Sequence, residues 1–146
     1  MIKLSRLSDY AIVVLSELAK NHGQQLTAQS LALSTRIPEP TVAKVLKLLS
    51  KQKIVNSARG VNGGYAMQRC PSTITVHELI VALEGPVALT ACTSHSNDSC
   101  NIEKLCPLRS GWQKINDAIT GTLDGMYLND LFLTPVIKQP HDGRGV

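Results

Sequence analysis

The sequence of 146 residues predicts a mainly α-helical fold with one small β-hairpin and a long helix in its C-terminal half. Three observations predict this fold class. Apolar residues recur every three or four positions in several segments, two short strand-like runs flank a glycine-bearing turn at residues 60–64, and a long amphipathic segment follows Pro107. With 43 % hydrophobic residues, the chain can bury a core of its own.

The first two predicted helices lie before residue 34. One lies within residues 5–20 and ends at His22-Gly23, and the other spans residues 28–33 with Thr27 as its N-cap. Residues 34–38 then form a turn. The apolar face of the first helix consists of Leu7, Ala11, Val14, Leu15 and Leu18.

The third predicted helix begins at Pro40, whose missing N–H costs nothing in a first helical turn, and runs to about Gln52. Its apolar face consists of Val42, Val45, Leu46 and Leu49, and its opposite face of Thr41, Lys44, Lys47 and Lys51. Two helices joined by a short turn, the second with a basic outer face, are typical of the helix-turn-helix, whose second helix enters the major groove of DNA. An ordinary solvated helix face is the alternative interpretation of the lysines.

A β-hairpin is predicted directly after the third helix. Its strands are residues 54–58 and 65–67, and the turn between them contains the sequence G-V-N-G-G. A hairpin in this place is typical of the wing of a winged helix-turn-helix, and Arg59 at its tip is placed to reach a narrow minor groove. The candidate DNA contacts are Pro40, Thr41, Lys44, Lys47, Lys51, Arg59 and Asn62.

Charge is distributed unevenly along the chain. Residues 1–70 carry ten Lys/Arg against three Asp/Glu, a net charge of +7, whereas residues 71–146 carry five against eight, a net charge of −3. A basic half joined to an acidic half indicates that one end of the molecule binds a polyanion. The pattern favours double-stranded DNA as the partner of the N-terminal half.

The second half contains two further predicted helices. The fourth spans residues 76–84, between Thr75 as its cap and Gly85-Pro86. The fifth, opened by Pro107, carries an apolar stripe of Leu108, Trp112, Ile115 and Ile119. This stripe either packs onto the chain's own domain or forms a seam with a second copy. A small DNA-binding domain leaves little core for a long helix to cover, which favours a homodimer.

The expected domain organisation has three parts. Residues 1–70 form a winged helix-turn-helix DNA-binding domain, and residues 71–133 hold a cysteine-bearing loop, a dimerisation helix and a last short turn at 127–133. Residues 134–146 are rich in Pro and Gly and form a flexible tail.

Three of the four cysteines, Cys92, Cys100 and Cys106, lie on one polar loop with the spacing C-x7-C-x5-C. Soft thiolates select zinc or an iron–sulfur cluster over harder ions, and the closely paired cysteines typical of tetrahedral zinc are absent. The wide spacing favours a cluster. A structural zinc, a thiol–disulfide switch, structural disulfides and idle buried thiols are the alternatives.

Several function classes are disfavoured. The sequence shows no signal-peptide pattern and no apolar run of about 18 residues, so we expect a cytoplasmic protein without a membrane span. It also shows no nucleophile–base pair, phosphate-binding loop or paired carboxylates, which argues against an enzyme and a small-molecule substrate.

Three segments together resemble the bacterial winged-helix iron–sulfur regulators of the IscR/NsrR family: L-S-R-L-S-D-Y-A near the start, R-G-V-N-G-G-Y in the wing and C-x7-C-x5-C-P-L in the loop. The resemblance covers about residues 1–133. Within that family, the segments T-V-A-K-V-L-K-L-L, A-L-E-G-P-V-A-L-T-A-C and C-P-L-R-S-G-W-Q-K-I-N are most similar to regulators found beside SUF cluster-assembly genes.

The resemblance implies a homodimer that binds a pseudo-palindromic operator and controls transcription, with repression favoured, according to the state of a bound cluster. It implies that Cys92, Cys100 and Cys106 ligate the cluster, that the third helix reads DNA and that Arg59 is the wing contact. An NO-responsive repressor of the NsrR type is the alternative within the family.

The resemblance also implies a fourth ligand from outside the loop, and two departures from the family pattern concern it. Arg109 stands where members with an IscR-type 2Fe–2S site have a ligating histidine, and the longer first gap of the loop makes His95 or Asp98 candidates. NsrR-like members take an aspartate from the partner chain, and Asp9 stands in the matching place, which favours 4Fe–4S over 2Fe–2S. The alternative role of Asp9 is a helix cap, and Cys70 is expected to take no part.

Overall fold

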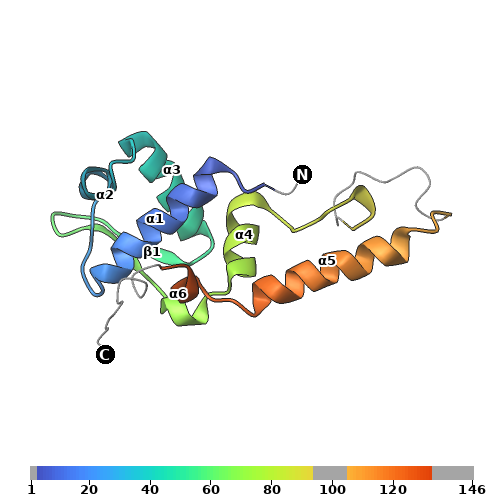
Figure 1. Cartoon of the computed structure of the whole chain (residues 1–146). Coiled ribbons are helices and arrows are strands. Elements are labelled where there is room, and N and C mark those ends of the chain that lie inside the picture. Colours follow the sequence, from blue (N-terminus) through green and yellow to red (C-terminus); the bar gives the residue numbers. More distant parts are fainter. Residues whose placement is uncertain (1–2, 94–104, 133–146) are drawn as a thin grey trace, which may run out of the picture.

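The structure, a computed structural model, describes residues 3–93 and 105–132. Within these residues it contains six α-helices, two short 3₁₀ helices and a two-stranded hairpin. In chain order the elements are α1 (Arg6–Lys20), α2 (Ala28–Thr35), α3 (Glu39–Lys51), β1 (Val55–Ala58), β2 (Gly64–Met67), η1 (Pro71–Thr73), α4 (Val76–Glu84), η2 (Ala91–Thr93), α5 (Arg109–Asp124) and α6 (Leu128–Leu131). Figure 1 shows most of them gathered in one body, from which α5 extends. The predicted fold class, a mainly helical winged helix-turn-helix, is confirmed.

The beginnings of α1 and α2 follow from local side-chain chemistry. Ser5 Oγ accepts a hydrogen bond from the Ser8 backbone N–H at 3.3 Å, and Thr27 Oγ1 accepts one from the Ser30 N–H at 3.0 Å. α2 extends to Thr35, two residues beyond its predicted end, because the Thr35 hydroxyl donates to a backbone carbonyl one turn earlier at 2.6 Å.

One hydrophobic core joins the first three helices to the wing and to later elements. The predicted apolar face of α3 is completely buried, and α4 and α6 each add a leucine. Burying one such aliphatic side chain stabilises the fold by roughly 1.5–3 kcal/mol, so this core holds α3 in place far more firmly than helix propensity does. The most deeply buried residues are Ala11, Val14, Leu15, Leu18, Leu31, Val42, Val45, Leu46, Leu49, Ile54, Val55, Ile74, Leu79 and Leu128.

The wing is a hairpin with an additional backbone contact. β1 and β2 pair antiparallel, with Ala58 opposite Gly64. The stretch before α2 joins them, since the Leu26 N–H donates to the Tyr65 carbonyl at 2.9 Å and the Tyr65 N–H to the Leu26 carbonyl at 2.7 Å. A Cβ on Gly64 would lie 2.7 Å from the Leu26 carbonyl oxygen, so only glycine permits this close approach. The wing is therefore attached directly to the helix-turn-helix.

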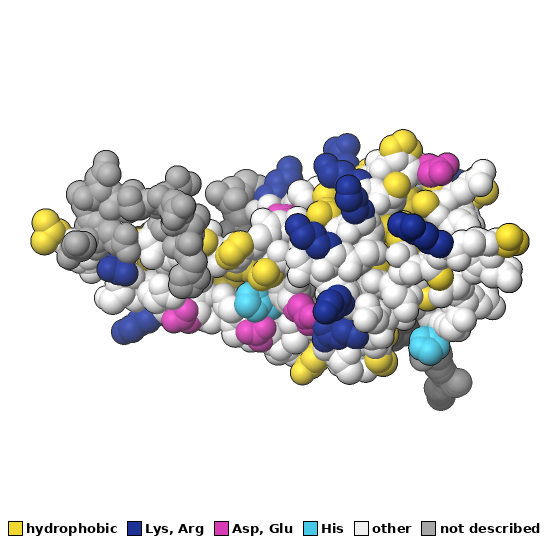
Figure 2. Space-filling view, turned by 180° about the vertical axis from the view of Figure 1, so that it is seen from behind, with side chains coloured by type: hydrophobic (Ala, Val, Ile, Leu, Met, Phe, Trp, Pro, Cys, Tyr) yellow, Lys and Arg dark blue, Asp and Glu magenta, His cyan; other side chains and the backbone are white. Residues whose placement is uncertain are grey.

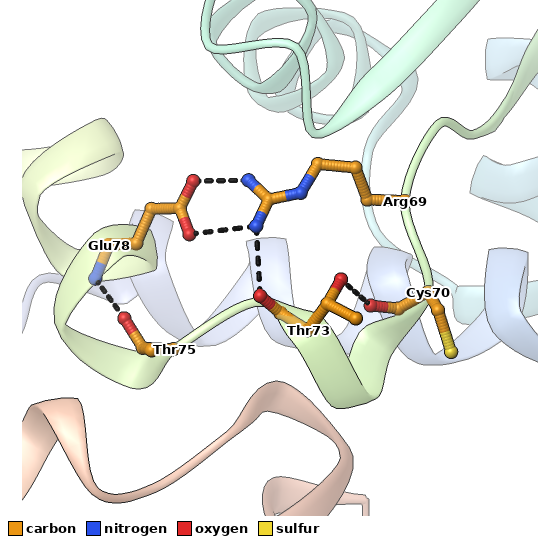
Figure 3. Close-up of polar contacts among 5 residues, drawn as sticks. All are labelled: Arg69, Cys70, Thr73, Thr75 and Glu78. Carbon is orange, nitrogen blue, oxygen red and sulfur yellow. Dashed lines mark hydrogen bonds and ion pairs between the residues drawn. The ribbon is translucent and has the colours of Figure 1, made fainter.

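A polar network connects the hairpin to α4 (Figure 3). The Arg69 guanidinium forms a two-point ion pair with the Glu78 carboxylate and also donates to the Thr73 carbonyl at 2.8 Å. Thr75 Oγ1 accepts a hydrogen bond from the Glu78 N–H at 3.0 Å and caps α4, as predicted. Because Glu78 neutralises Arg69, this arginine adds little to the charge that DNA would meet.

After α5 the chain returns to the body. The Val76 N–H donates to the Met126 carbonyl and the Leu128 N–H to the Ile74 carbonyl, both at 2.8 Å, and α6 packs beside η1. α5 itself begins at Arg109 rather than at Pro107. In the part of the chain that the structure describes, no helix is long and apolar enough to cross a membrane.

The apolar stripe along α5 is left largely uncovered by the described part of the chain. Leu108 is 60 % exposed, Trp112 39 % and Ile115 48 %, while Ile119 is half-buried. The only buried residue of α5 is polar, Asn116. Among the described residues, the chain's own domain therefore does not cover the stripe. That the stripe forms a seam with a second copy stays a prediction.

Candidate nucleic-acid interface and cysteine-bearing segment

The outer face of α3 presents the predicted DNA-reading residues. Pro40, Lys44, Lys47 and Lys51 are exposed, and Thr41 is half-buried. The opposite face of α3 packs against α1 and α2. Among residues 3–93 and 105–132, no hydrogen bond or ion pair engages the three ammonium groups. They are therefore available to phosphate oxygens.

The wing presents the two remaining candidate DNA contacts. Arg59 and Asn62 are exposed in the turn between β1 and β2. The wing follows α3 through a tight connection in which Lys53 has a left-handed backbone (φ 58°) and the Ile54 N–H donates to the Leu49 carbonyl at 3.0 Å. α3 and the wing are thus held together by backbone hydrogen bonds and by the core.

Basic side chains gather on the body of the molecule. Figure 2 shows most of the visible Lys and Arg side chains over the body and fewer along the extended part. This arrangement agrees with the net charge of +7 in residues 1–70. A surface of this charge attracts a nucleic-acid backbone through many weak phosphate contacts.

Two of the three predicted metal-binding cysteines lie within the described residues, and both are half-buried free thiols. Cys92 lies in η2, which packs against α5, and its Sγ is 3.1 Å from the Thr90 hydroxyl oxygen. Cys106 lies just before α5. The two thiols therefore come from separate segments, one of which packs against α5 while the other leads into it.

The described residues hold only part of the predicted site. In them, no group of three His, Cys, Asp or Glu side chains comes together. Cys100, His95 and Asp98 lie outside the described residues. The donor set nevertheless fits a soft metal or an iron–sulfur cluster, because both described thiols are partly accessible and neither is in a disulfide.

Asp9 lies in the first turn of α1 with an exposed side chain. Ser5, and not Asp9, is the N-cap of this helix, so the alternative role of Asp9 as a cap is already filled. Across the described residues, the Asp9 carboxylate has no hydrogen bond or ion pair. The helix dipole is its one evident favourable interaction there.

Cys70 lies apart from Cys92 in the chain, before α4 rather than after it. Its thiol is exposed and lies 3.0 Å from the Ser72 hydroxyl oxygen, and this hydrogen bond lowers the pKa of the Cys70 thiol. That Cys70 takes no part in a metal site stays a prediction.

One contact that the sequence did not reveal joins the start of α1 to the end of α4. The Glu84 carboxylate accepts hydrogen bonds from the Ser8 hydroxyl and, at 2.7 Å, from the Ser5 backbone N–H. These bonds lower the pKa of Glu84, the Ser8 bond most strongly. One signal for it lies in the sequence, because an acidic residue at the C-terminal end of a helix opposes the helix dipole and needs another partner.

The chain is similar to known regulators over nearly all of its length. A model of the family described as Rrf2, iron-dependent transcriptional regulator, matches residues 4–133. The HTH-type transcriptional regulator NsrR of Bacillus licheniformis is 29 % identical over 133 residues, which is 90 % of this chain and 93 % of that protein. The structure of CymR, the global cysteine regulator of B. subtilis, has a TM-score of 0.67 at 31 % identity and covers 90 % of this chain and 97 % of its own. The structure of T. potens IscR has a TM-score of 0.66 at 26 % identity, and the match covers 97 % of this chain and 94 % of that one.

Proposed function

Because the chain belongs to the Rrf2 family of iron-dependent transcriptional regulators, we propose that it controls transcription through an iron–sulfur cluster that Cys92, Cys100 and Cys106 ligate. The family and the relatives are transcriptional regulators rather than enzymes. A bound cluster would supply sensitivity to oxygen, NO or iron supply. We further propose that the protein is a homodimeric repressor and that cluster-assembly genes are its targets.

The observation that carries the proposal is that Cys92 and Cys106 are free, half-buried thiols, one on a segment that packs against α5 and the other on the segment that leads into it. Thiolates of this kind suit an iron–sulfur cluster or zinc and not a hard ion. Arg109 cannot ligate iron, so the fourth ligand comes from elsewhere. We propose that it is Asp9 of a second copy, and that the cluster is 4Fe–4S.

The proposed reading of DNA uses α3 and the wing. Pro40, Thr41, Lys44, Lys47 and Lys51 contact the major groove and its phosphates, and Arg59 and Asn62 contact DNA from the wing. Two copies present two α3 helices, so the operator is a pseudo-palindrome with half-sites about 34 Å apart or a multiple of that distance.

The test is anaerobic isolation from iron-replete cells, followed by a visible spectrum and by DNA binding before and after cluster removal. The wild type should be brown. Cys92→Ala, Cys100→Ala and Cys106→Ala should each remove the colour, since each removes one of three thiolate ligands. Cys70→Ala is the matched control and should keep it. A colourless wild type with one equivalent of zinc would contradict the cluster and favour a structural zinc.

The similarity to NsrR of Bacillus licheniformis favours a second candidate, an NO-responsive repressor. The same ligands serve both functions, so the sites of binding in the genome distinguish them. Chromatin immunoprecipitation should recover promoters of cluster-assembly genes under the first proposal and of NO-detoxification genes under the second.

A further inference from the structure

Asn116 is the one residue of α5 whose side chain is buried, at 6 % exposure. Its amide bonds to the backbone of the segment between α4 and Cys92. Oδ1 accepts a hydrogen bond from the Leu89 N–H at 3.1 Å, and Nδ2 donates to the Val87 carbonyl at 3.3 Å. Among the described residues, no backbone–backbone hydrogen bond holds Val87 or Leu89. Asn116 thus supplies the polar contacts that fix this segment on α5.

The position of Cys92 follows from this contact through a short, closed turn. The Thr90 N–H donates to Thr93 Oγ1 at 3.2 Å, and the Thr93 N–H donates to the Thr90 carbonyl at 3.0 Å. The Thr93 hydroxyl also donates to that carbonyl at 2.9 Å, and Thr93 is buried. Because the turn begins directly after Leu89, a displacement of Leu89 from α5 displaces the Cys92 thiol with it.

The same helix determines where Cys106 lies. Cys106 lies three residues before α5, and its carbonyl accepts a hydrogen bond from the Arg109 N–H at 3.4 Å, whereas Asn116 lies about two turns into the helix. A helix of this length is stiff, so its start and Asn116 keep a constant separation. A contact that anchors the Cys92 segment at Asn116 therefore holds that segment at a set position relative to the start of α5, to which Cys106 is hydrogen-bonded.

We propose that Asn116 is a positioning residue that holds the Val87–Leu89 segment on α5 and thereby places Cys92 relative to Cys106. The role of the two thiols as ligands rests on the proposed function, whereas the anchoring itself does not. An apolar side chain at position 116 would fill the space without bonding the Leu89 N–H and the Val87 carbonyl. The amide of Asn116 instead satisfies one donor and one acceptor of the segment together.

The experiment compares full-length Asn116→Ala and Asn116→Asp with the matched control Gln113→Ala. Gln113 is an exposed amide on α5 that, among the residues the structure describes, donates within its own helix, to Asp117 at 2.8 Å. In reduced, metal-free protein, alkylation of each cysteine by iodoacetamide is followed by mass spectrometry of its peptide. Asn116→Ala should accelerate alkylation of Cys92 several-fold and leave the rate at the exposed Cys70 unchanged.

The other variants distinguish a loss of Cys92 positioning from a general destabilisation of the fold. Asn116→Asp keeps an acceptor for the Leu89 N–H but sets a carboxylate oxygen against the Val87 carbonyl, so it too should accelerate alkylation of Cys92. Gln113→Ala should match the wild type. An unchanged Cys92 rate in Asn116→Ala would overturn the inference, and so would an equal acceleration at Cys70 and Cys92.

The second measurement is the stability of the cluster in protein isolated anaerobically with the cluster bound. Visible absorbance should decay several-fold faster in Asn116→Ala than in Gln113→Ala, because the thiol pair loses its fixed spacing. A colourless wild type with selective acceleration at Cys92 would overturn the proposed cluster and support the positioning role. A brown wild type whose absorbance decays at the same rate in Asn116→Ala would support the cluster and overturn the positioning role.

Discussion

Asp9 carries an exposed carboxylate that the described part of its own chain does not engage. If it ligates a cluster in a second copy, it is a hard oxygen donor at a soft site and is weakly held. We expect Asp9→Ala to retain a cluster on three thiolates, with an altered visible spectrum and a several-fold faster loss. Its DNA affinity should shift toward that of the cluster-free protein in gel-shift titrations.

Two further variants distinguish the effect of the Asp9 charge from the effect of the α1 cap. Asp9→Asn keeps the shape and removes the charge, so it should share the spectral change. Ser5→Ala removes the cap of α1, which costs about 1 kcal/mol of stability, and should leave the spectrum unchanged. If both Asp9 variants match the wild type, the fourth ligand has to be sought at His95, Asp98 or Glu103.

The exposed lysines of α3 give a prediction about salt. If about 6–8 phosphates are neutralised by the dimer, log K should fall with log salt at a slope of about −5 to −7. Lys44→Ala and Lys47→Ala should weaken binding to all sequences and make the slope shallower by about 1 for each lost phosphate contact. Arg59→Ala should weaken binding most at operators with a narrow minor groove.

Lys20→Ala is the control for these variants. Lys20 is also exposed, but it lies on α1 and pairs with Glu17 at 3.6 Å. Its loss should leave the salt slope at the wild-type value. An affinity of the wild type that does not change with salt concentration would contradict the proposed interface.

At the scale of elements, the contact between α1 and α4 depends on pH. The pKa of Glu84 is lowered by hydrogen bonds from Ser8 and Ser5, so the contact stabilises the fold above the ordinary glutamate pKa of about 4.3. This stabilisation is lost as the pH falls through the lowered pKa. We expect Glu84→Gln to reduce the free energy of unfolding at pH 7 by about 0.5 kcal/mol, since solvent screens the contact.

Urea unfolding at pH 7 and at about pH 3 measures this effect. The difference in free energy of unfolding between the wild type and Glu84→Gln should be smaller at the lower pH. In Ser8→Ala, which removes the hydroxyl donor to Glu84, adding Glu84→Gln should lower the free energy of unfolding by less than it does in the wild type. A difference that stays constant with pH would show that the charge of Glu84 is not involved.

The elements themselves were predictable where local chemistry determines them. α4 has the predicted bounds because Thr75 caps it and Gly85 ends it. The end of α2 was not predictable, because Ser34 and Thr35 are weak helix formers whose hydroxyls here bond to the Leu31 carbonyl.

The candidate site was predictable in its residue types and not in its supporting contacts. Spacing alone made the three cysteines candidate ligands, which stays a prediction, and the period of α3 placed its lysines on the outer face, where they are exposed. The bond between Ser8 and Glu84 joins residues 76 positions apart, and that between Leu89 and Asn116 joins residues 27 apart. No local pattern specifies such pairs, because they form only when the helices have packed.

At the scale of the whole molecule, the extended α5 and its exposed stripe predict assembly. Exposed apolar side chains in a row along one helix are unfavourable in water unless a partner covers them. Ile115→Glu places a charge in the proposed seam, so it should convert a dimer into a monomer and reduce operator affinity by about tenfold or more. Light scattering after gel filtration and gel-shift titration measure the two effects.

Leu33→Glu is the control for this variant. Leu33 is 77 % exposed and lies on α2 in the body, so the dimer should persist. A wild type that remains monomeric at micromolar concentrations would contradict the proposed seam.

The backbone bonds between Leu26 and Tyr65 limit how this molecule can adapt to DNA. They attach the wing to the stretch that leads into α2, while α2 packs against α3. The base of the wing is thereby tied to the helix-turn-helix, so each copy presents α3 and the wing to the duplex as one unit. In the proposed dimer, adjustment between operators then comes from the rotation of one copy against the other. Inserting or deleting one base pair between half-sites turns the second site by about a tenth of a helical turn, and in the proposed dimer the rotation of one copy against the other has to absorb the whole of that change.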